Sequence, residues 1–326
     1  KILVVDAAAD NSAGDVTITI ADGYTDSSLT IDGSALDLNA IDLTAGEGLT
    51  VSSSDTNVAL TVIGGASHDT LTTNAGADNV TGGGGNDTIS SGGGKDSIYG
   101  GTGVDSINAG AGVDYIEAGA GNDIIEVTDD GDFKTSGGVE TIKGGDGTDT
   151  LKFTENATVT ITAPEVEHLY SIEKIQFGNG GNAAKITFGN ATFTNLGAES
   201  ITIVGNTANS GTNFIDASAV TNGAISTTGN TTTSNDDSIY GGGMNDTFTF
   251  SGTAGLEDGD IVDGNGGTDT IALNNDAAVT VTIDADDITD VEVVKTVTTG
   301  GGNSGGNVTV VTVSYTHLTL PTTSCG

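Results

Sequence analysis

From Gly64 to Glu126 the sequence reads GGASHDTLT, TNAGADNVT, GGGGNDTIS, SGGGKDSIY, GGTGVDSIN, AGAGVDYIE and AGAGNDIIE, which are seven nine-residue units without an insertion. The eighth position of each unit is aliphatic, and the sixth is always aspartate. These aspartates are Asp69, Asp78, Asp87, Asp96, Asp105, Asp114 and Asp123. Such a strict repeat decides the fold, because every unit must form the same local structure.

Each unit can form one turn and one short strand. A strand of three residues such as 88–90 points one side chain inward and two outward, and the preceding glycines tolerate the positive φ angles of a tight turn. Two units then complete one lap, and stacked laps form two parallel sheets. We expect Leu71, Ile89, Ile107 and Ile125 to line one sheet, and Val80, Ile98 and Ile116 to line the other. The predicted fold is all-β, a parallel β-roll flanked by β-rich segments that could continue the solenoid.

The aliphatic core of this roll is too thin to offset the entropy of ordering so many glycines. Stacking also places aspartates in columns one lap apart, where like charges repel one another. Calcium binds six to eight oxygens from carboxylates and carbonyls, and the glycine-rich turns present carbonyls beside each aspartate. The block therefore predicts Ca²⁺ as its cofactor. The alternative is a Gly/Asn/Asp solenoid whose turns hold no ions.

This pattern, GGxGxDx(aliphatic)x, resembles the RTX (repeats-in-toxin) calcium-binding β-roll family. The resemblance covers 64–126 without a gap and extends more loosely over 135–152 and 232–272. It implies that each ion lies between turns one lap apart, bound by two position-six aspartates and by turn carbonyls. The implied aspartate pairs are Asp69–Asp87, Asp78–Asp96, Asp87–Asp105, Asp96–Asp114 and Asp105–Asp123. The implied carbonyl ligands are Gly83, Gly85, Gly92, Gly94, Gly100, Gly101, Thr102, Gly103, Gly110 and Gly112, and the looser blocks add Asp149, Asp246 and Asp269 as metal ligands.

Some units depart from the family pattern. Ser67 replaces a glycine at position four, and Thr73 and Asn74 replace the first two glycines of the second unit. Sites that use those turns are expected to be weaker than the central ones. Glu140 stands at position six of the unit 135–143 and is one methylene longer than aspartate, which weakens the expectation of sites there. Asp258, Asp260 and Asp263 miss the spacing of an EF-hand loop and are interpreted as a solvated acidic loop, with an irregular calcium site as the alternative.

The repeats divide the chain into seven segments. We expect a β-rich segment 1–63, the roll 64–126, an interrupted continuation 127–152, a β-rich segment 153–231, a second degenerate block 232–272, a β-rich segment with a Gly-rich loop 273–312, and a tail 313–326. The composition changes abruptly in this tail, which resembles translated sequencing-adapter read-through and is set aside from the reasoning on the fold.

The charge of the chain restricts its partners. The formal net charge is −37, and the eight basic residues are all lysine. Nucleic-acid binding needs a basic surface, so it is excluded. The sequence contains no run of eighteen apolar residues, so it predicts no membrane-spanning helix. The expected partners are calcium ions, and through calcium other copies of a surface protein or a cell-surface polysaccharide.

Catalytic residues and organic-cofactor sites are not expected in this sequence. Gly302–Gly306 fits the spacing of a nucleophile elbow around Ser304, but a glycine tract matches almost any such pattern. His168 is the one histidine outside the calcium turns and the tail, and it has no evident partnership with Ser304. We therefore expect that the chain is not an enzyme.

The segments 28–36, 172–177 and 213–220 resemble sequences that adjoin RTX blocks in bacterial surface-layer and adhesin-like proteins. This resemblance implies a secreted or cell-surface protein exported through a type I channel. The predicted function is a calcium-binding structural module of such a surface protein, folding outside the cell. The alternative is the non-catalytic folding and export module of a secreted enzyme or toxin.

Overall fold

The structure, a computed structural model, describes the parts of the chain that form the two units below. These residues are 2–4, 16–20, 28–32, 49–53, 59–128, 140–154, 159–163, 168–177, 184–189, 200–204, 213–228, 236–251, 256, 259–274, 279–284, 287–297 and 308–313. Unit 1 comprises Lys1–Phe153 with His168–Ile172, and unit 2 comprises Thr154–Glu167 with Glu173–Gly326. The tail 314–326, Asp258 and Ser304 lie outside the described residues.

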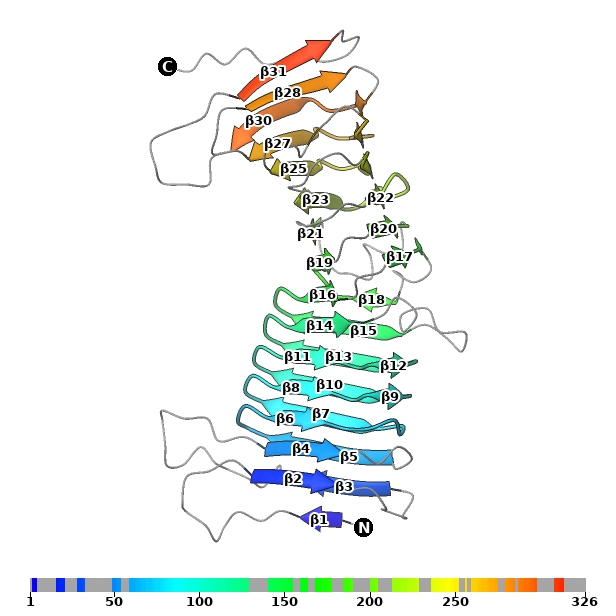
Figure 1. The fold of residues 1–326 in the computed structure, drawn as a ribbon, viewed down its shortest axis with the longest axis vertical. Coiled ribbons are helices and arrows are strands. Elements are labelled where there is room, and N and C mark those ends of the chain that lie inside the picture. Colours follow the sequence, from blue (N-terminus) through cyan, green and yellow to red (C-terminus); the bar gives the residue numbers. More distant parts are fainter. Residues whose placement is uncertain are drawn as a thin grey trace. The chain divides into compact units, whose positions relative to one another are not determined.

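Unit 1 is a roll of two parallel sheets (Figure 1). Sheet 1 contains, in spatial order, β1 (Ile2–Val4), β3 (Ser28–Asp32), β5 (Ala59–Gly65), β7 (Asn79–Gly84), β10 (Ser97–Thr102), β13 (Tyr115–Ala120), β15 (Thr141–Asp146) and β18 (Leu169–Tyr170). Sheet 2 of this unit contains β2 (Val16–Ile20), β4 (Leu49–Ser53), β6 (Thr70–Thr72), β8 (Thr88–Ser90), β11 (Ser106–Asn108), β14 (Ile124–Val127) and β16 (Thr150–Phe153). Consecutive strands in the sequence alternate between the sheets, so the chain winds in laps.

The register of unit 1 confirms which aliphatic residues share a sheet. In sheet 1 Ile98 pairs with Val80 on one side and with Ile116 on the other. In sheet 2 Ile107 pairs with Ile89 and Ile125 in the same way, and Leu71 pairs with Ile89. All seven side chains are buried. The aliphatic position of each unit therefore forms the core, as the repeat predicts.

A longer lap follows the seven regular units without disturbing this register. Ile125 in β14 still pairs with Leu151 in β16, and Ile116 in β13 with Ile142 in β15. The turn that leaves β14 includes residues outside the described part, whereas the strands on either side keep their partners. An insertion in a turn thus leaves the stacking of strands unchanged.

Unit 2 is also a parallel roll of two sheets. Sheet 3 contains β17 (Val159–Ile161), β20 (Ala184–Thr187), β22 (Phe214–Asp216), β24 (Ser238–Tyr240), β26 (Ile261–Asp263) and β29 (Ile288–Thr289). Sheet 4 contains β19 (Lys174–Phe177), β21 (Ser200–Val204), β23 (Ala224–Thr228), β25 (Thr247–Ser251), β27 (Thr270–Asn274) and β30 (Val293–Val297). A separate parallel pair joins β28 (Val279–Asp284) and β31 (Val308–Val313). The prediction of an all-β roll with a continued solenoid is confirmed.

The two units differ in what they bury. A regular lap of unit 1 buries single aliphatic side chains from strands of three residues, as Ile89 in β8 shows. In unit 2 the five-residue strand β25 buries both Phe248 and Phe250, and Phe188 is also buried. Because a phenylalanine buries more apolar area than a short aliphatic side chain, the core of unit 2 is thicker at these laps.

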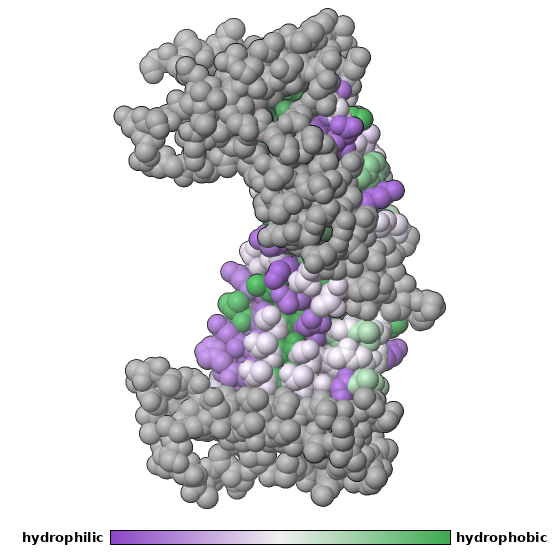
Figure 2. Space-filling model, viewed as in Figure 1, coloured by the Kyte–Doolittle hydropathy of each residue, from purple (hydrophilic) through white to green (hydrophobic). Residues whose placement is uncertain are grey.

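The exterior of the described strands is mostly polar. Outward-facing positions of sheet 2 carry residues such as Thr88, Ser106 and Asn108. Figure 2 shows hydrophilic and near-neutral residues over much of the described face in that view, with apolar residues scattered among them. A helix of the length and apolarity needed to cross a membrane is not found in the described part of the chain.

Candidate metal sites

The position-six aspartates of unit 1 are buried directly before their strands. Their exposed fractions lie between 1 and 3%. In five of them, from Asp87 to Asp123, the Oδ1 atom accepts a hydrogen bond from the backbone N–H of the aspartate one lap earlier, which we call the interlap hydrogen bond. It measures 2.8 Å for Asp69–Asp87, Asp78–Asp96, Asp87–Asp105, Asp96–Asp114 and Asp105–Asp123. The structure therefore brings together all five aspartate pairs that the sequence analysis named.

The second carboxylate oxygen has a different environment. The Oδ2 atoms of Asp87, Asp96, Asp105 and Asp123 are buried and have no hydrogen-bond partner among the described residues. Burying a charged oxygen without a partner is costly unless a cation or a proton compensates it. These oxygens are thus the strongest sign, within the structure itself, that something positive belongs beside the turns.

A glycine at position one leaves space beside this oxygen. A Cβ atom built on Gly82 would lie 2.6 Å from the Gly100 carbonyl oxygen and closer still to Asp87 Oδ2. On Gly100 it would lie 2.6 Å from Asp105 Oδ2 and closer to the Ala118 carbonyl oxygen. We call this combination, a carboxylate oxygen of one turn and a carbonyl oxygen from the next lap, an oxygen pair. It recurs at Gly64 and Gly144, where the carboxylates are those of Asp69 and Asp149.

The other carbonyl groups that the resemblance implied lie in columns along the turns. The carbonyls of Gly83, Gly85, Gly92, Gly94, Gly101 and Gly103 each face the equivalent glycine one lap later. Gly112 in β12 (Ala111–Gly112) pairs with Gly94 in β9 (Gly93–Gly94), Thr102 pairs with Gly84 and Ala120, and Gly110 lies over Gly92. The Gly92 carbonyl already accepts the N–H of Ala111 at 2.8 Å. Positive φ angles, +112° at Gly83 and +119° at Gly101, explain why glycine is needed in these columns.

The turns on the two edges of the roll differ at position one. Turns that lead from sheet 1 to sheet 2 begin with Gly64, Gly82, Gly100 and Ala118, whereas those on the other edge begin with Thr73, Ser91 and Ala109. The Thr73 hydroxyl donates to the Ser91 carbonyl at 2.9 Å, and the Ser91 hydroxyl donates to the Ala109 carbonyl at 2.7 Å. Two turns of the other edge thus carry a hydroxyl group at position one, where the first edge has glycine or alanine.

Asn74 gives a physical reason for the weaker site predicted at the second unit. Its backbone N–H donates to Asp78 Oδ2 at 3.3 Å, and Leu60 N–H donates to Asp78 Oδ1 at 2.7 Å. Both carboxylate oxygens of Asp78 are therefore engaged within the protein. An ion at this aspartate would have to compete with these hydrogen bonds, unlike an ion at Asp87.

Burial strongly affects the protonation of the central aspartates. Burial, together with the carboxylates of Asp105 and Asp69, raises the pKa of Asp87 to about 7. Burial likewise raises the pKa of Asp96 to about 7 and that of Asp105 to about 6. It also raises the pKa of Asp78 and Asp123. A nearby cation would oppose this effect by favouring the charged form, so protons and metal ions compete for the same oxygens.

The donor set fits a hard cation. No group of three or more His, Cys, Asp or Glu side chains converges on a point within the described residues. The available donors are carboxylates in pairs and main-chain carbonyls, an all-oxygen set of the kind calcium binds. The soft ligands that transition metals favour are not gathered at these turns.

The looser blocks show the same placement of acidic residues. Asp149 is buried, and its Oδ1 accepts the N–H of Asp123 at 2.8 Å across a lap of 26 residues. Glu140 is buried directly before β15. In unit 2 Asp269 Oδ1 accepts the N–H of Asp246 at 2.7 Å across 23 residues. The interlap hydrogen bond is therefore independent of the length of the lap.

Sequence reasoning missed a second acidic column in unit 2. Asp260 Oδ1 accepts the N–H of Asp237 at 2.8 Å, and Asp237 Oδ1 accepts that of Asn213 at 2.7 Å. The interpretation of Asp260 as part of a solvated loop is wrong, because its exposed fraction is 4%. The signal that could have found it is an acidic residue immediately before an alternating strand, here Ile261–Asp263, regardless of the period.

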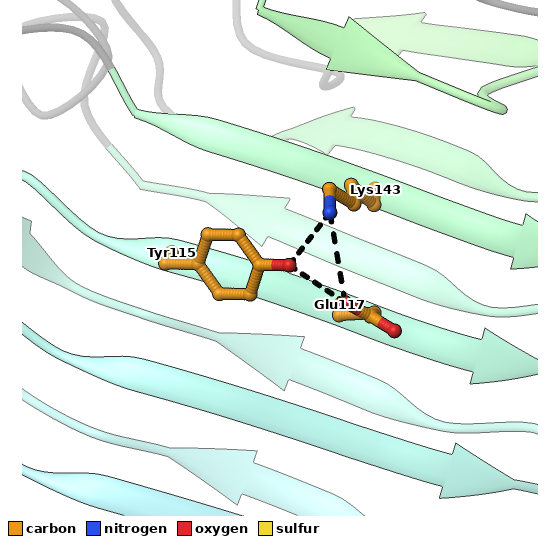
Figure 3. Close-up of polar contacts among 3 residues, drawn as sticks. All are labelled: Tyr115, Glu117 and Lys143. Atoms are coloured by element: carbon orange, nitrogen blue, oxygen red, sulfur yellow. Dashed lines mark hydrogen bonds and ion pairs between the residues drawn. The ribbon is translucent and has the colours of Figure 1, made fainter.

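Figure 3 shows a polar cluster on the outer face of sheet 1, formed by Tyr115, Glu117 and Lys143. The Tyr115 hydroxyl donates to Glu117 Oε2 at 2.6 Å, and Lys143 Nζ donates to the Tyr115 hydroxyl at 2.7 Å. Lys143 Nζ also lies 3.7 Å from Glu117 Oε2. These three groups contact one another across β13 and β15, so the cluster links neighbouring laps.

Comparison with known proteins agrees with the repeat. A family model described as the RTX calcium-binding nonapeptide repeat (4 copies) matches residues 63–98, 90–125 and 135–152. A search of curated proteins found no match. The stretch 63–152 therefore carries RTX calcium-binding repeats, and such repeats bind Ca²⁺. As a module these repeats are structural and non-catalytic.

Proposed function

We propose, with the RTX repeats of residues 63–152 as the premise, that this chain is a structural part of a secreted bacterial surface protein of the surface-layer or adhesin-like class. In this proposal the repeats fold when calcium binds outside the cell. The observation that carries it is the row of buried, unpaired Oδ2 atoms at Asp87, Asp96, Asp105 and Asp123. A column of this kind is stable only with compensating positive charge.

The ligands we propose are the position-six aspartates together with turn carbonyls. At the oxygen pairs the carboxylates are those of Asp69, Asp87 and Asp105, each beside the carbonyl of the position-one residue one lap later. Bound Ca²⁺ supplies two positive charges and an oxygen-coordinating centre at these places. The protein itself supplies the spacing, because the interlap hydrogen bonds hold successive carboxylates in register.

Calcium concentration then determines where the repeats fold. The formal net charge of −37 favours an extended chain when the carboxylates are not neutralised. Extracellular calcium modules typically bind with Kd values of about 10⁻⁴–10⁻³ M, far above cytosolic calcium. A chain with sites of that strength stays unfolded during export and folds outside, because binding to the folded state alone adds to its stability.

The surface-protein assignment is supported by the flanking segments. Residues 213–220 and 28–36 resemble sequences that adjoin RTX blocks in surface-layer and adhesin-like chains, and unit 2 is a further parallel roll. Calcium could also link the acidic surface to other copies of the protein or to a cell-surface polysaccharide. The alternative is the folding and export module of a secreted enzyme or toxin. The sequence of the complete gene discriminates them, since a catalytic or acylated domain upstream favours the alternative.

Circular dichroism of the full chain, in chelator and in millimolar calcium, tests the proposal. We expect β-sheet signal to increase on adding calcium, because residues 64–126 lack the apolar core to fold without it. The Asp87→Asn/Asp105→Asn double variant keeps an acceptor for each interlap hydrogen bond and removes two charges, so it should need more calcium. Identical spectra of the unmodified chain in the two conditions would contradict the proposal.

A further inference from the structure

We propose that Tyr99 and Tyr115 form a site of oxidative coupling, at which a carbon–carbon bond between their rings joins two neighbouring laps of unit 1. The reagent that this site takes is a one-electron oxidant of phenols, of the class of a peroxidase with hydrogen peroxide. The inference goes beyond the proposed function, because it depends on the stacking of β10 and β13 and not on the ions that stabilise the roll.

The two tyrosine rings lie beside each other on the outer face of sheet 1. Tyr99 in β10 is opposite Glu117 in β13, and Tyr115 stands two residues before Glu117, so the tyrosines are diagonal neighbours. Diagonal neighbours on one face of a sheet are within reach of aromatic side chains. The ring centroids are 5.9 Å apart, and the ring planes are inclined by 50°. At this separation, modest rotations of the two side chains bring ring carbons into contact.

Both phenols are open to oxidation, for different reasons. Tyr99 has an exposed fraction of 39%, so an oxidant in solution reaches its ring directly. The Tyr115 hydroxyl donates to Glu117 Oε2 at 2.6 Å, and its hydroxyl end points toward this carboxylate (Figure 3). Lys143 Nζ lies 4.9 Å from the centroid of the Tyr115 ring. Because this cation disfavours a second positive charge on the ring, the phenolic proton leaves together with the electron, and Glu117 is at the distance of a general base.

The coupling balances as a two-electron oxidation. Each tyrosine loses one electron and its phenolic proton and becomes a neutral phenoxyl radical. The two radicals join through ring carbons beside the phenol oxygens, and the hydrogen on each of these carbons then moves to the oxygen and restores the phenol. The two electrons and two protons reduce one hydrogen peroxide to two waters. The product is one cross-linked tyrosine pair that has lost two hydrogens.

The bond would act as a covalent staple between laps. The sequence contains a single cysteine, so a disulfide within it is ruled out. A link between residues 99 and 115 closes a loop in the unfolded chain, and closing such a loop stabilises the folded state. The coupled roll should therefore remain folded at lower calcium concentrations than the uncoupled one.

Unit 2 contains a natural control for this pair. The rings of Phe214 and Tyr240 are also 5.9 Å apart, with an inclination of 53°, and Lys185 Nζ lies 5.2 Å from the centroid of the Phe214 ring. The arrangement thus resembles that of Tyr99, Tyr115 and Lys143, but one of the two phenols is missing. The pair in unit 2 should not couple.

Treatment of the folded full chain with a peroxidase and hydrogen peroxide, followed by cleavage before aspartate and mass spectrometry, tests the inference. The peptides 96–104 and 114–122 should appear joined and two hydrogens lighter than their sum, as the main coupled product within one chain. Tyr115→Phe keeps the ring and removes the phenol, so it should abolish this product. Tyr170→Phe is the matched control, because Tyr170 is opposite Lys143 in the same sheet, and it should leave the product intact.

A gain-of-function variant makes the test independent of any loss of folding. Phe214→Tyr supplies the missing phenol in unit 2 and should create a second coupled product, between position 214 and Tyr240. Absence of the Tyr99–Tyr115 product in the folded chain overturns the inference, as does an equal yield of products that contain Tyr170.

The staple itself is measured by the calcium concentration at the midpoint of folding, followed by circular dichroism. The peroxidase-treated chain should have a lower midpoint than the equally treated Tyr115→Phe variant, and equal midpoints would overturn the stapling. The untreated chain reports the proposed function separately, since its response to calcium does not involve the tyrosine link.

Discussion

The nonapeptide block of unit 1 and the laps of unit 2 both place a buried aspartate directly before a short parallel strand. They differ in the number of residues in each lap. Interlap hydrogen bonds join residues 18 apart in the block and residues 21, 23 or 24 apart in unit 2. Their lengths are 2.8 Å in the block and 2.7–2.8 Å in unit 2. Strand stacking is thus set by the sheets and the carboxylates, whereas the metal sites that we propose also depend on a small residue at position one.

The cores of the two regions suggest unequal dependence on calcium. A strand such as β8 contributes one inward side chain, Ile89, whereas β25 contributes two, Phe248 and Phe250. In unit 2 the backbone N–H and the side-chain amide of Asn213 also donate hydrogen bonds to the two carboxylate oxygens of Asp237. We therefore expect calcium to control folding of the block and only to stabilise unit 2.

Removal of calcium should give the largest difference between the two regions. In chelator, amides of residues 82–126 should lose their protection from hydrogen exchange, because carboxylate repulsion is no longer compensated and the aliphatic core is thin. Peptides covering β23 and β25 should keep a larger share of theirs. Equal loss in both regions would show that core thickness does not set the dependence on calcium.

Magnesium should replace calcium poorly in the block. Magnesium requires near-octahedral geometry and gives up its water reluctantly, while these turns offer carbonyls spaced by backbone stacking. Titration of the chelated chain with each ion, followed by circular dichroism, measures the difference. Folding at similar concentrations of both ions would mean that the turn carbonyls do not take part in binding.

Filling the space at a position-one glycine should weaken binding in both regions. In Gly82→Ala the new Cβ would meet Asp87 Oδ2 and the Gly100 carbonyl, at a position without a positive φ angle. We expect destabilisation of about 1–3 kcal/mol, typical of overpacking, together with a higher calcium requirement.

Gly84→Ala is the matched control, since its Cβ would have no neighbour nearer than 3.4 Å. Gly264→Ala and Gly266→Ala make the same pair in unit 2, where the nearest atom to the Gly266 Cβ is at 3.5 Å. Thermal unfolding at several calcium concentrations compares the four variants. Equal effects of Gly82→Ala and Gly84→Ala would show that the oxygen pair at Gly82 does not take part in metal binding.

Acidification should produce the smallest effect, with opposite signs in the presence and absence of calcium. The pKa of Asp87 is raised from 3.8 to about 7 in the folded chain. Without calcium the folded state therefore binds protons more tightly, so stability is largest below pH 4 and is lost as pH rises through about 7. With calcium, protons compete, and affinity should fall between pH 8 and pH 6.

The pKa of Asp269 is raised by burial to about 6, below that of Asp87. Calcium affinity at Asp269 should accordingly begin to fall at a lower pH than affinity at Asp87 and Asp96, whose pKa values are both raised to about 7. Calcium titrations at pH 8, 7 and 6, read by exchange of region-specific peptides, compare the two. The same pH dependence in both regions would contradict the assignment of these carboxylates as ligands.

Much of the block could be predicted because its period is strict. An aliphatic residue every nine positions determines both sheets and the pairing of Ile89 with Ile107. A search for a fixed period could not find the role of Asp260, because in unit 2 the turns vary in length and no period links it to Asp237. Each central aspartate uses Oδ1 to accept a backbone N–H and directs Oδ2 toward the turn. This division depends on atomic positions, which the residue types alone do not reveal.

The lap that joins Asp123 to Asp149 has a practical consequence. It contains 26 residues where the laps before it contain 18, and its interlap hydrogen bond is as short as theirs. The eight additional residues of this lap thus leave the register of β14 and β16 unchanged. We expect that a peptide epitope or a binding loop grafted into this lap would leave β14 and β16 paired, and that calcium would control its presentation together with the laps that support it.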